Sequence, residues 1–119
     1  MAEARAFQRT TRQSPYKMRL VIDQIRGQRV NDALALLKFS KKHAAEQIEK
    51  TLLSAVANAQ QAARAANASL DEDALLVIMK AIVNEGPKLK RWTPAAMGRA
   101  TPMIKRTSHV EIIIAEAVR

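Results

Sequence analysis

Residues 85–110 read EGPKLKRWTPAAMGRATPMIKRTSHV, and the interpretation of the whole chain starts from this stretch. Between Gly86 and His109 it holds six cations and no acid, with too few apolar residues to build a core. Apolar runs border it, LLVIMKAIV at 75–83 and VEIIIAEAV at 110–118. The pattern predicts two paired strands joined by a long basic excursion. Such an excursion needs an outside partner, and a polyanion is the most favourable one.

The two apolar runs predict an antiparallel pair in which Ile82 lies opposite Val110. This register puts residues 93–98, TPAAMG, at the turn, where Pro and Gly are favoured. The alternation of the first run slips near Lys80, which predicts a β-bulge there. Each arm beyond the sheet then has about nine residues and a reach of roughly 30 Å.

A helix at 15–26 is the most clearly marked element outside the excursion. Ser14 can cap its start, and Pro15 suits its first position because a proline there loses no hydrogen bond. Arg19 and Arg26 fall off the apolar stripe and are expected to face outward. The stripe itself consists of Met18, Val21, Ile22 and Ile25.

Two further helices are predicted before the excursion. Asn31 caps a short helix that ends near Phe39, and Ser40 opens a longer one that runs to about Ala66. A short strand is also predicted at 2–12, and a loop at 67–73.

Length and composition limit the class of protein. One domain is expected for 119 residues, and the formal charge of +9 points to nucleic acid or an anionic surface. The chain has no cysteine and no apolar run long enough to cross a membrane. Its only histidines, His43 and His109, form no recognisable catalytic motif. We therefore expect no catalytic residue, no metal site, no cofactor, no small-molecule substrate and no membrane partner.

The cations of the excursion suit phosphate, because Arg presents a planar fork to phosphate oxygens and Lys a point charge. In an extended ribbon Lys88 and Lys90 share one face while Arg91 takes the other, so nucleic acid could surround the ribbon. A two-stranded ribbon is marginally stable alone in water, which favours insertion into a partner.

Trp92 is the only tryptophan of the chain, and two interpretations of it stay open. It could stack on a base or line a confined space. Alternatively, it could pack across the ribbon against Leu89 or Met103. The chain has only four aromatic residues, Phe7, Tyr16, Phe39 and Trp92, which argues against a sheet that reads single strands by stacking. Binding through backbone and shape is expected instead.

Three ordered motifs carry a resemblance to a known family. They are SPYKMRLVIDQIRG at 14–27, LLSAVANAQ at 52–60, and EGPKLKRWTPAAMGRA with IKRTSHVEIII at 85–100 and 104–114. On these motifs the chain resembles the ribosomal large-subunit protein L22 family, also called uL22, over residues 12–115. The resemblance implies an α+β fold: a small three-stranded antiparallel sheet packed with three helices, and one long protruding β-hairpin.

The resemblance also implies a function. Family members are structural, non-catalytic constituents of the large ribosomal subunit that bind its rRNA. Their globular part, here about 1–84 and 108–119, lies on the subunit, while the hairpin, here about 85–107, runs through rRNA. The implied partners are large-subunit rRNA, neighbouring large-subunit proteins and, at the hairpin tip in the exit-tunnel wall, the nascent peptide. A cytoplasmic ribosome is expected, with an organellar one as the alternative.

The resemblance and the charge pattern together give two sets of site residues. Contacts with rRNA are expected from Arg9, Arg12, Ser14, Lys17, Arg19, Lys88, Lys90, Arg91, Arg99, Lys105, Arg106, Thr107, Ser108 and His109. The tunnel-lining tip is expected to consist of Arg91, Trp92, Thr93, Pro94, Ala95, Ala96, Met97 and Gly98. Family members often carry basic residues where this chain has Ala95 and Met97, so two tip charges are missing here.

Two other functions compete with this one. The helix at 15–26, Gly27 and the helix at 31–39 could form a helix-turn-helix of a DNA-binding regulator. The exposed positions of the second helix, Asp32 and Ala35 among them, give no base-reading set. Basic amphipathic helices could instead hold the chain at a membrane surface, but the long helix is rich in alanine and lacks bulky aromatic residues.

Overall fold

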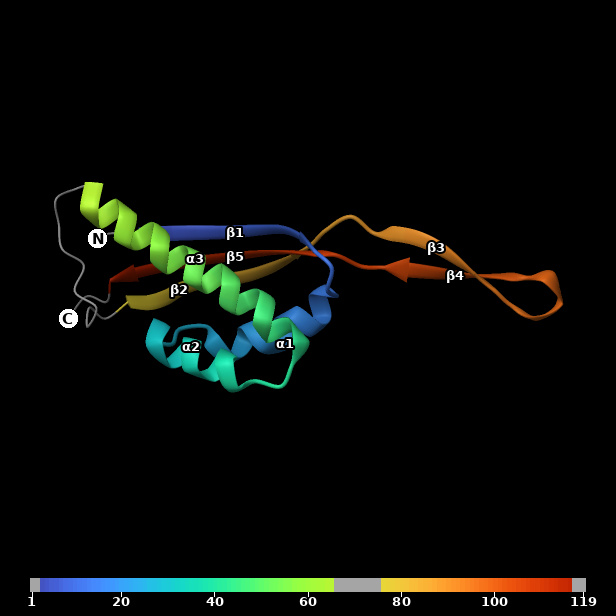
Figure 1. Ribbon diagram of the computed structural model, residues 1–119, viewed down its shortest axis with the longest axis horizontal. Coiled ribbons are helices and arrows are strands. Elements are labelled where there is room, and N and C mark those ends of the chain that lie inside the picture. The colour runs from blue at the N-terminus through green and yellow to red at the C-terminus, as the bar shows by residue number, and fades with distance from the viewer. Residues whose placement is uncertain (1–2, 66–75, 117–119) are drawn as a thin grey trace.

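The computed structural model describes residues 3–65 and 76–116 of the chain. Within them, three helices and a sheet form a body from which a hairpin protrudes (Figure 1). The predicted α+β fold is confirmed, whereas the loop predicted at 67–73 lies outside the described residues. In chain order the elements are β1 (Glu3–Thr11), α1 (Pro15–Ile25), α2 (Val30–Phe39), α3 (His43–Ala65), β2 (Leu76–Glu85), β3 (Leu89–Pro94), η1 (Ala96–Gly98), β4 (Ala100–Lys105) and β5 (Ser108–Glu116).

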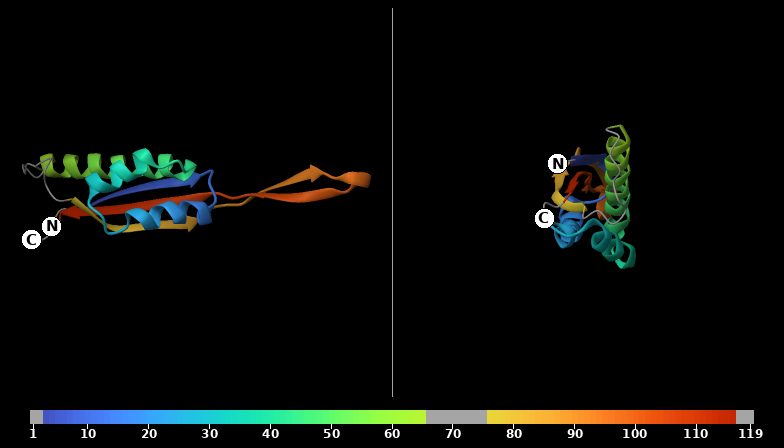
Figure 2. Two further views of the ribbon diagram at one scale, coloured as in Figure 1. Left: turned by 90° about the horizontal axis from the view of Figure 1, so that it is seen from below. Right: turned by 90° about the vertical axis from the view of Figure 1, so that its left-hand side faces the viewer.

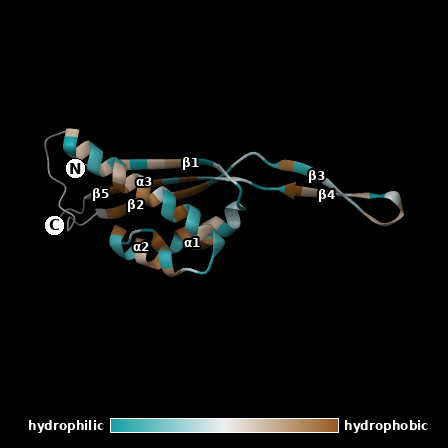
Figure 3. Ribbon diagram, in the orientation of Figure 1, coloured by the Kyte–Doolittle hydropathy of each residue, from teal (hydrophilic) through white to brown (hydrophobic). Residues whose placement is uncertain are grey.

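The three-stranded sheet is antiparallel, with β5 in the centre, β1 along one edge and β2 along the other. Successive side chains of a strand point to opposite faces, so Val110, Ile112 and Ile114 of β5 all enter the core. Figure 2 shows the helices on one side of this sheet, and Figure 3 shows hydrophobic residues on β2 and β5. The other face, which carries Arg5 and Phe7, has no helix over it among the described residues.

The β-bulge predicted near Lys80 is confirmed, because the pairing of β2 with β5 shifts between Ile78 and Lys80. Met79 is the extra residue and is exposed. Ile78 and Ala81, which flank the bulge, both lie in the core. The bulge thus keeps the apolar residues of β2 on one face although their spacing in the sequence is irregular.

The register predicted between β2 and β5 was wrong by one residue. Val83 lies opposite Val110, while Ile82 lies opposite Glu111. The predicted register made the two arms equal, at about nine residues each. In the structure the neck of the hairpin has three residues on one arm, 86–88, and two on the other, 106–107. The shift places Val83 in the core and turns Ile82 to the uncovered face.

The start of α1 was predicted correctly, and two other helix starts were not. α1 begins at Pro15, where the Met18 N–H donates to the Ser14 carbonyl at 3.1 Å, although the Ser14 side chain makes no capping bond. Asn31 lies inside the first turn of α2, because the buried Val30 already belongs to that helix. Ser40 ends α2 by donating its N–H to the Leu37 carbonyl, and α3 begins three residues later.

Candidate nucleic-acid interface

The hairpin has two chemically different faces, which the register of β3 and β4 defines. Side chains alternate along each strand, and directly opposed residues share a face. We call one the cationic face, formed by Leu89, Arg91, Thr93, Thr101, Met103 and Lys105. The other is the tryptophan face, formed by Lys90, Trp92, Pro94, Ala100, Pro102 and Ile104. As expected from the sequence, Lys90 and Arg91 point to opposite sides.

No acid of the described residues pairs with the positive charge of the hairpin. The ion pairs found in residues 3–65 and 76–116 join Arg5 to Glu111 and Arg26 to Asp23, and neither involves the hairpin. The only side-chain hydrogen bond of a hairpin cation in the same part of the chain joins Arg91 to the neighbouring Lys90 carbonyl. All six hairpin cations are exposed: Lys88, Lys90, Arg91, Arg99, Lys105 and Arg106.

The tip of the hairpin is a short 3-10 turn closed by one backbone hydrogen bond. The Ala95 N–H donates to the Arg99 carbonyl at 2.7 Å. Met97 has a φ of 61° and Gly98 a φ of 73°, so two consecutive residues adopt left-handed backbone and reverse the chain. Met97 is 96% exposed and projects from the end of the protein.

The neck connects the hairpin to the sheet through buried groups. The Gly86 N–H donates to the Thr107 carbonyl at 2.9 Å, and the Thr107 hydroxyl donates to the Pro87 carbonyl at 2.6 Å. Thr107 and Ser108, both expected to contact rRNA, are buried. The hydroxyl of Ser108 has no partner among the described residues. In this structure Thr107 holds the two arms of the neck together, and direct contact of these hydroxyls with rRNA stays a prediction.

His109, the next predicted contact residue, is tied to β1. Its Nδ1 accepts a hydrogen bond from the Thr10 N–H at 2.9 Å. The ring lies 5.9 Å from that of Phe7, centroid to centroid. The guanidinium groups of Arg9 and Arg5 lie 5.5 and 5.9 Å from the Phe7 ring centroid, within cation–π range. These residues continue the basic surface from the neck onto the sheet.

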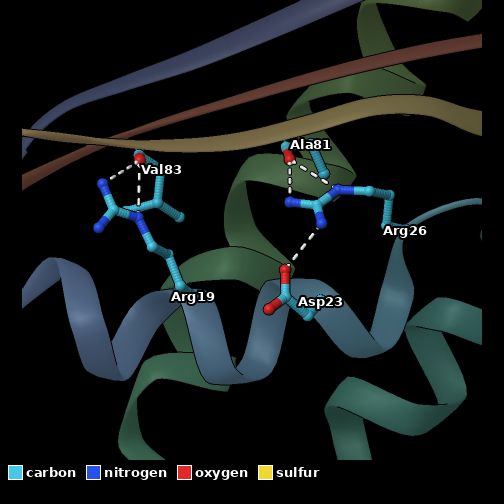
Figure 4. A network of polar contacts seen from close by, with 5 residues as sticks. All are labelled: Arg19, Asp23, Arg26, Ala81 and Val83. Carbon is cyan, nitrogen blue, oxygen red and sulfur yellow. Dashed lines mark hydrogen bonds and ion pairs between the residues drawn. The ribbon is translucent and has the colours of Figure 1, made fainter.

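Arg19 and Arg26 do not simply face outward as predicted. Both guanidinium groups reach the free edge of β2 (Figure 4). Arg19 donates from Nε and Nη2 to the Val83 carbonyl at 3.3 and 3.0 Å. Arg26 donates to the Ala81 carbonyl from Nε and Nη2 at 3.3 and 2.8 Å. An edge strand leaves carbonyls without partners, and these two side chains satisfy them.

The remaining predicted contact residues lie where β1 meets α1. Thr11, the last residue of β1, pairs with Ser108 at the base of the hairpin. Arg12 and Lys17 follow it and are exposed, whereas Ser14 is half-buried. Figure 1 shows the start of α1 beside the neck of the hairpin. Contact of each with rRNA stays a prediction.

Comparison with known proteins identifies the family. Residues 6–115 match the family described as Ribosomal protein L22p/L17e. The chain belongs to this family. It is 51% identical over 118 residues to the large ribosomal subunit protein uL22 of Magnetococcus marinus, with 99% of each chain covered. It is 49% identical over 116 residues to the uL22 protein of Streptococcus pyogenes, covering 98% of this chain and 96% of the relative.

Some features of this L22-family chain were missed at the sequence level. Arg5 and Phe7 were not among the predicted rRNA contacts, although Phe7 is one of four aromatic residues and alternates with Arg5 and Arg9. That alternation in a predicted strand was the available signal, because it puts all three on one face. The tight contact of Gly86 with Thr107 could not be predicted from the sequence, because it depends on the two arms of the hairpin meeting in space.

Two classes of feature are absent from the part of this L22-family chain that the structure describes. No helix within residues 3–65 and 76–116 is long and apolar enough to cross a membrane. Over the same ranges, no three His, Asp or Glu residues gather in a way that could hold a metal ion.

Proposed function

We propose that this chain is a structural, non-catalytic constituent of the large ribosomal subunit and binds large-subunit rRNA through its basic surfaces. One observation carries the proposal: the hairpin exposes six cations, and the described acids neutralise none of them. The family and the names of the relatives, both large ribosomal subunit proteins, support it. Ordering a ribbon with no core of its own costs conformational entropy, which pairing with phosphates offsets.

In this proposal the hairpin is inserted in rRNA and the sheet end binds beside it. Arg9, Arg12 and Lys17 extend the phosphate contacts from the neck to the start of α1. Thr107 contributes indirectly: its hydroxyl donates to the Pro87 carbonyl and so fixes the direction in which the hairpin leaves the sheet. Arg19 donates from Nε and Nη2 to the Val83 carbonyl at the edge of β2. Only its remaining N–H groups are then available to bind a phosphate.

We further propose that the tip, residues 91–98, helps to form the wall of the nascent-peptide exit tunnel of a cytoplasmic ribosome. Met97 and Ala95 stand at positions where a basic residue is common in the family, so the tip offers the nascent peptide an apolar surface. The 96% exposure of Met97 supports this, because only the surroundings of the tip can cover it. Neighbouring large-subunit proteins are the remaining partners.

A salt titration tests the rRNA proposal. Each phosphate contact contributes about −0.7 to −0.9 to the slope of log K against log salt. Six to ten contacts therefore lower the affinity for a bacterial large-subunit rRNA transcript about a thousandfold or more between 50 and 200 mM salt. The double variant Arg91→Gln, Lys105→Gln should lose two contacts and make the slope shallower by about 1.5.

The matched control is Lys50→Gln, Arg64→Gln, which removes the same charge from exposed positions of α3. It should leave the slope nearly unchanged. A salt-independent affinity, or equal losses from both double variants, contradicts binding through the hairpin.

A crosslinking experiment tests the position of the tip. A photoreactive residue at position 97 of the full chain, assembled into large subunits, should crosslink to a stalled nascent peptide. The same group at position 53, an exposed site on α3, should not. Crosslinks from position 97 to rRNA alone contradict a tip that faces the tunnel.

A further inference from the structure

The tryptophan face of the hairpin is almost free of charge, although it belongs to a segment with six cations and no acid. Only Lys90, at the end nearest the neck, is ionised; the other five residues are Trp92, Pro94, Ala100, Pro102 and Ile104. The cationic face holds Arg91 and Lys105 together with two threonines, Leu89 and Met103. The two sides of the ribbon are therefore suited to different parts of a ligand.

Packing within the hairpin does not account for Trp92. The residue directly opposite is Pro102, and the indole is still 68% exposed. Leu89 and Met103, which the sequence suggested as packing partners, lie on the cationic face. Ile104, on the same face as Trp92, is also exposed. A contiguous apolar surface with a large indole at its centre thus lacks a partner within the described chain.

We propose that the hairpin divides its RNA contacts between its faces: phosphates bind at the cationic face, and unpaired nucleobases stack on the tryptophan face at Trp92. This deepens the proposed function and rests on it. Trp92 is then a stacking platform, flanked by the rings of Pro94 and Pro102. Bases stack on aromatic side chains irrespective of sequence, because every base has a π-face.

Charge decides between a base and a polypeptide as the occupant of this face. Any group that covers Trp92 lies on a two-stranded ribbon with six cations, Lys90 on the same face among them, and no acid. An RNA strand supplies an apolar base face and a negative charge in each nucleotide. A protein segment would have to be strongly acidic as well as apolar to match both.

The sole tryptophan makes the proposal directly measurable. Binding of the full chain to a bacterial large-subunit rRNA transcript should quench Trp92 emission and shield it from acrylamide. Trp92→Leu should lower the affinity roughly 5- to 100-fold, as loss of one stacked base does, without changing the salt slope. Trp92→Phe, which keeps an aromatic ring, should restore most of the affinity.

Phe39→Leu is the matched control for Trp92→Leu, because Phe39 is 82% exposed at the end of α2, in the body of the protein. It should leave binding unchanged. Arg91→Gln, Lys105→Gln should show the converse pattern, with a shallower salt slope and Trp92 still quenched in the bound state.

The outcomes separate this inference from the function on which it rests. Normal binding by Trp92→Leu, together with unquenched Trp92 emission in the bound wild-type protein, overturns the stacking proposal. A slope change in Arg91→Gln, Lys105→Gln still supports rRNA binding in that case. Quenching that appears only when ribosomal proteins are added assigns the face to a polypeptide and also overturns stacking. Salt-independent binding in every variant overturns both.

Discussion

Gly86 lies so close to Thr107 that a Cβ added to Gly86 would stand 2.5 Å from the Thr107 Oγ1. The backbones of the two residues are joined as well, since the Gly86 N–H donates to the Thr107 carbonyl. The neck of the hairpin thus depends on a glycine, because the two arms of the hairpin approach each other closely there. The direction in which the hairpin leaves the sheet is set at this contact.

Gly86→Ala should therefore strain the neck and destabilise the protein by about 1–3 kcal/mol, in line with other overpacked sites. Chemical denaturation of the free protein measures the change. It should also weaken rRNA binding more than the loss of stability explains, because the hairpin is redirected.

A second substitution tests whether the hydroxyl causes that strain. Thr107→Ala alone loses its hydrogen bond to the Pro87 carbonyl, worth about 1 kcal/mol. In the double variant Gly86→Ala, Thr107→Ala the clash is relieved, so the loss should be smaller than the sum of the single losses. Additive losses contradict the contact as described.

Arg26→Met should lower the stability of the free protein by about 0.5–1.5 kcal/mol, because the Ala81 carbonyl at the edge of β2 loses its two-donor partner. Arg19→Met should do the same through Val83. Thermal unfolding without RNA measures both. Lys17→Met, on the same helix and exposed, is the control and should change little. If Arg19→Met has the same unfolding temperature as the wild type, the hydrogen bonds to Val83 do not stabilise the free protein. Arg19 would then be available for RNA binding alone.

Thr10→Asn should stabilise the protein by about 0.5–1 kcal/mol. Thr10 has a φ of 53°, a left-handed backbone that is costly for a β-branched residue and that asparagine tolerates far better. The hydrogen bond to His109 is kept, since it comes from the backbone N–H. Thr10→Val, which stays β-branched, should give no gain in urea unfolding. A gain from valine equal to that from asparagine would point to a cause other than the backbone.

Deleting residues 89–99 should leave the body folded. The buried core identified among the described residues includes no residue between 86 and 106. Far-UV circular dichroism should keep its helical signal, and the unfolding temperature should change by only a few degrees, while rRNA binding weakens strongly. A variant that loses its helices would show that the hairpin contributes to the core after all.

The elements marked by local chemistry could be predicted from the sequence, and so could the fold. Ser14-Pro15 located the start of α1, and the slipped alternation near Lys80 located the bulge. The long acid-free stretch located the hairpin. Each of these signals lies within a few neighbouring residues and needs no knowledge of tertiary contacts.

Features that depend on contacts distant in the sequence could not be predicted. The register between β2 and β5 continues into the contact of Gly86 with Thr107 at the neck, between residues distant in the sequence. Arg19 and Arg26 looked solvated because the edge they cover belongs to a strand about sixty residues later. Within the candidate site, the hairpin cations predicted as contacts are exposed and their contact with rRNA stays a prediction, whereas the cluster around Phe7 was not predicted.

The central position of β5 has a mechanical consequence. The hairpin continues directly into β5 on one arm and into β2 on the other, and β5 is hydrogen-bonded along both of its edges. A pull along the hairpin axis would load the hydrogen bonds of β5 to β1 and β2 in shear. Many of these bonds would then share the force at the same time, instead of breaking one after another. The body can therefore hold the tip in place against a force directed along the hairpin.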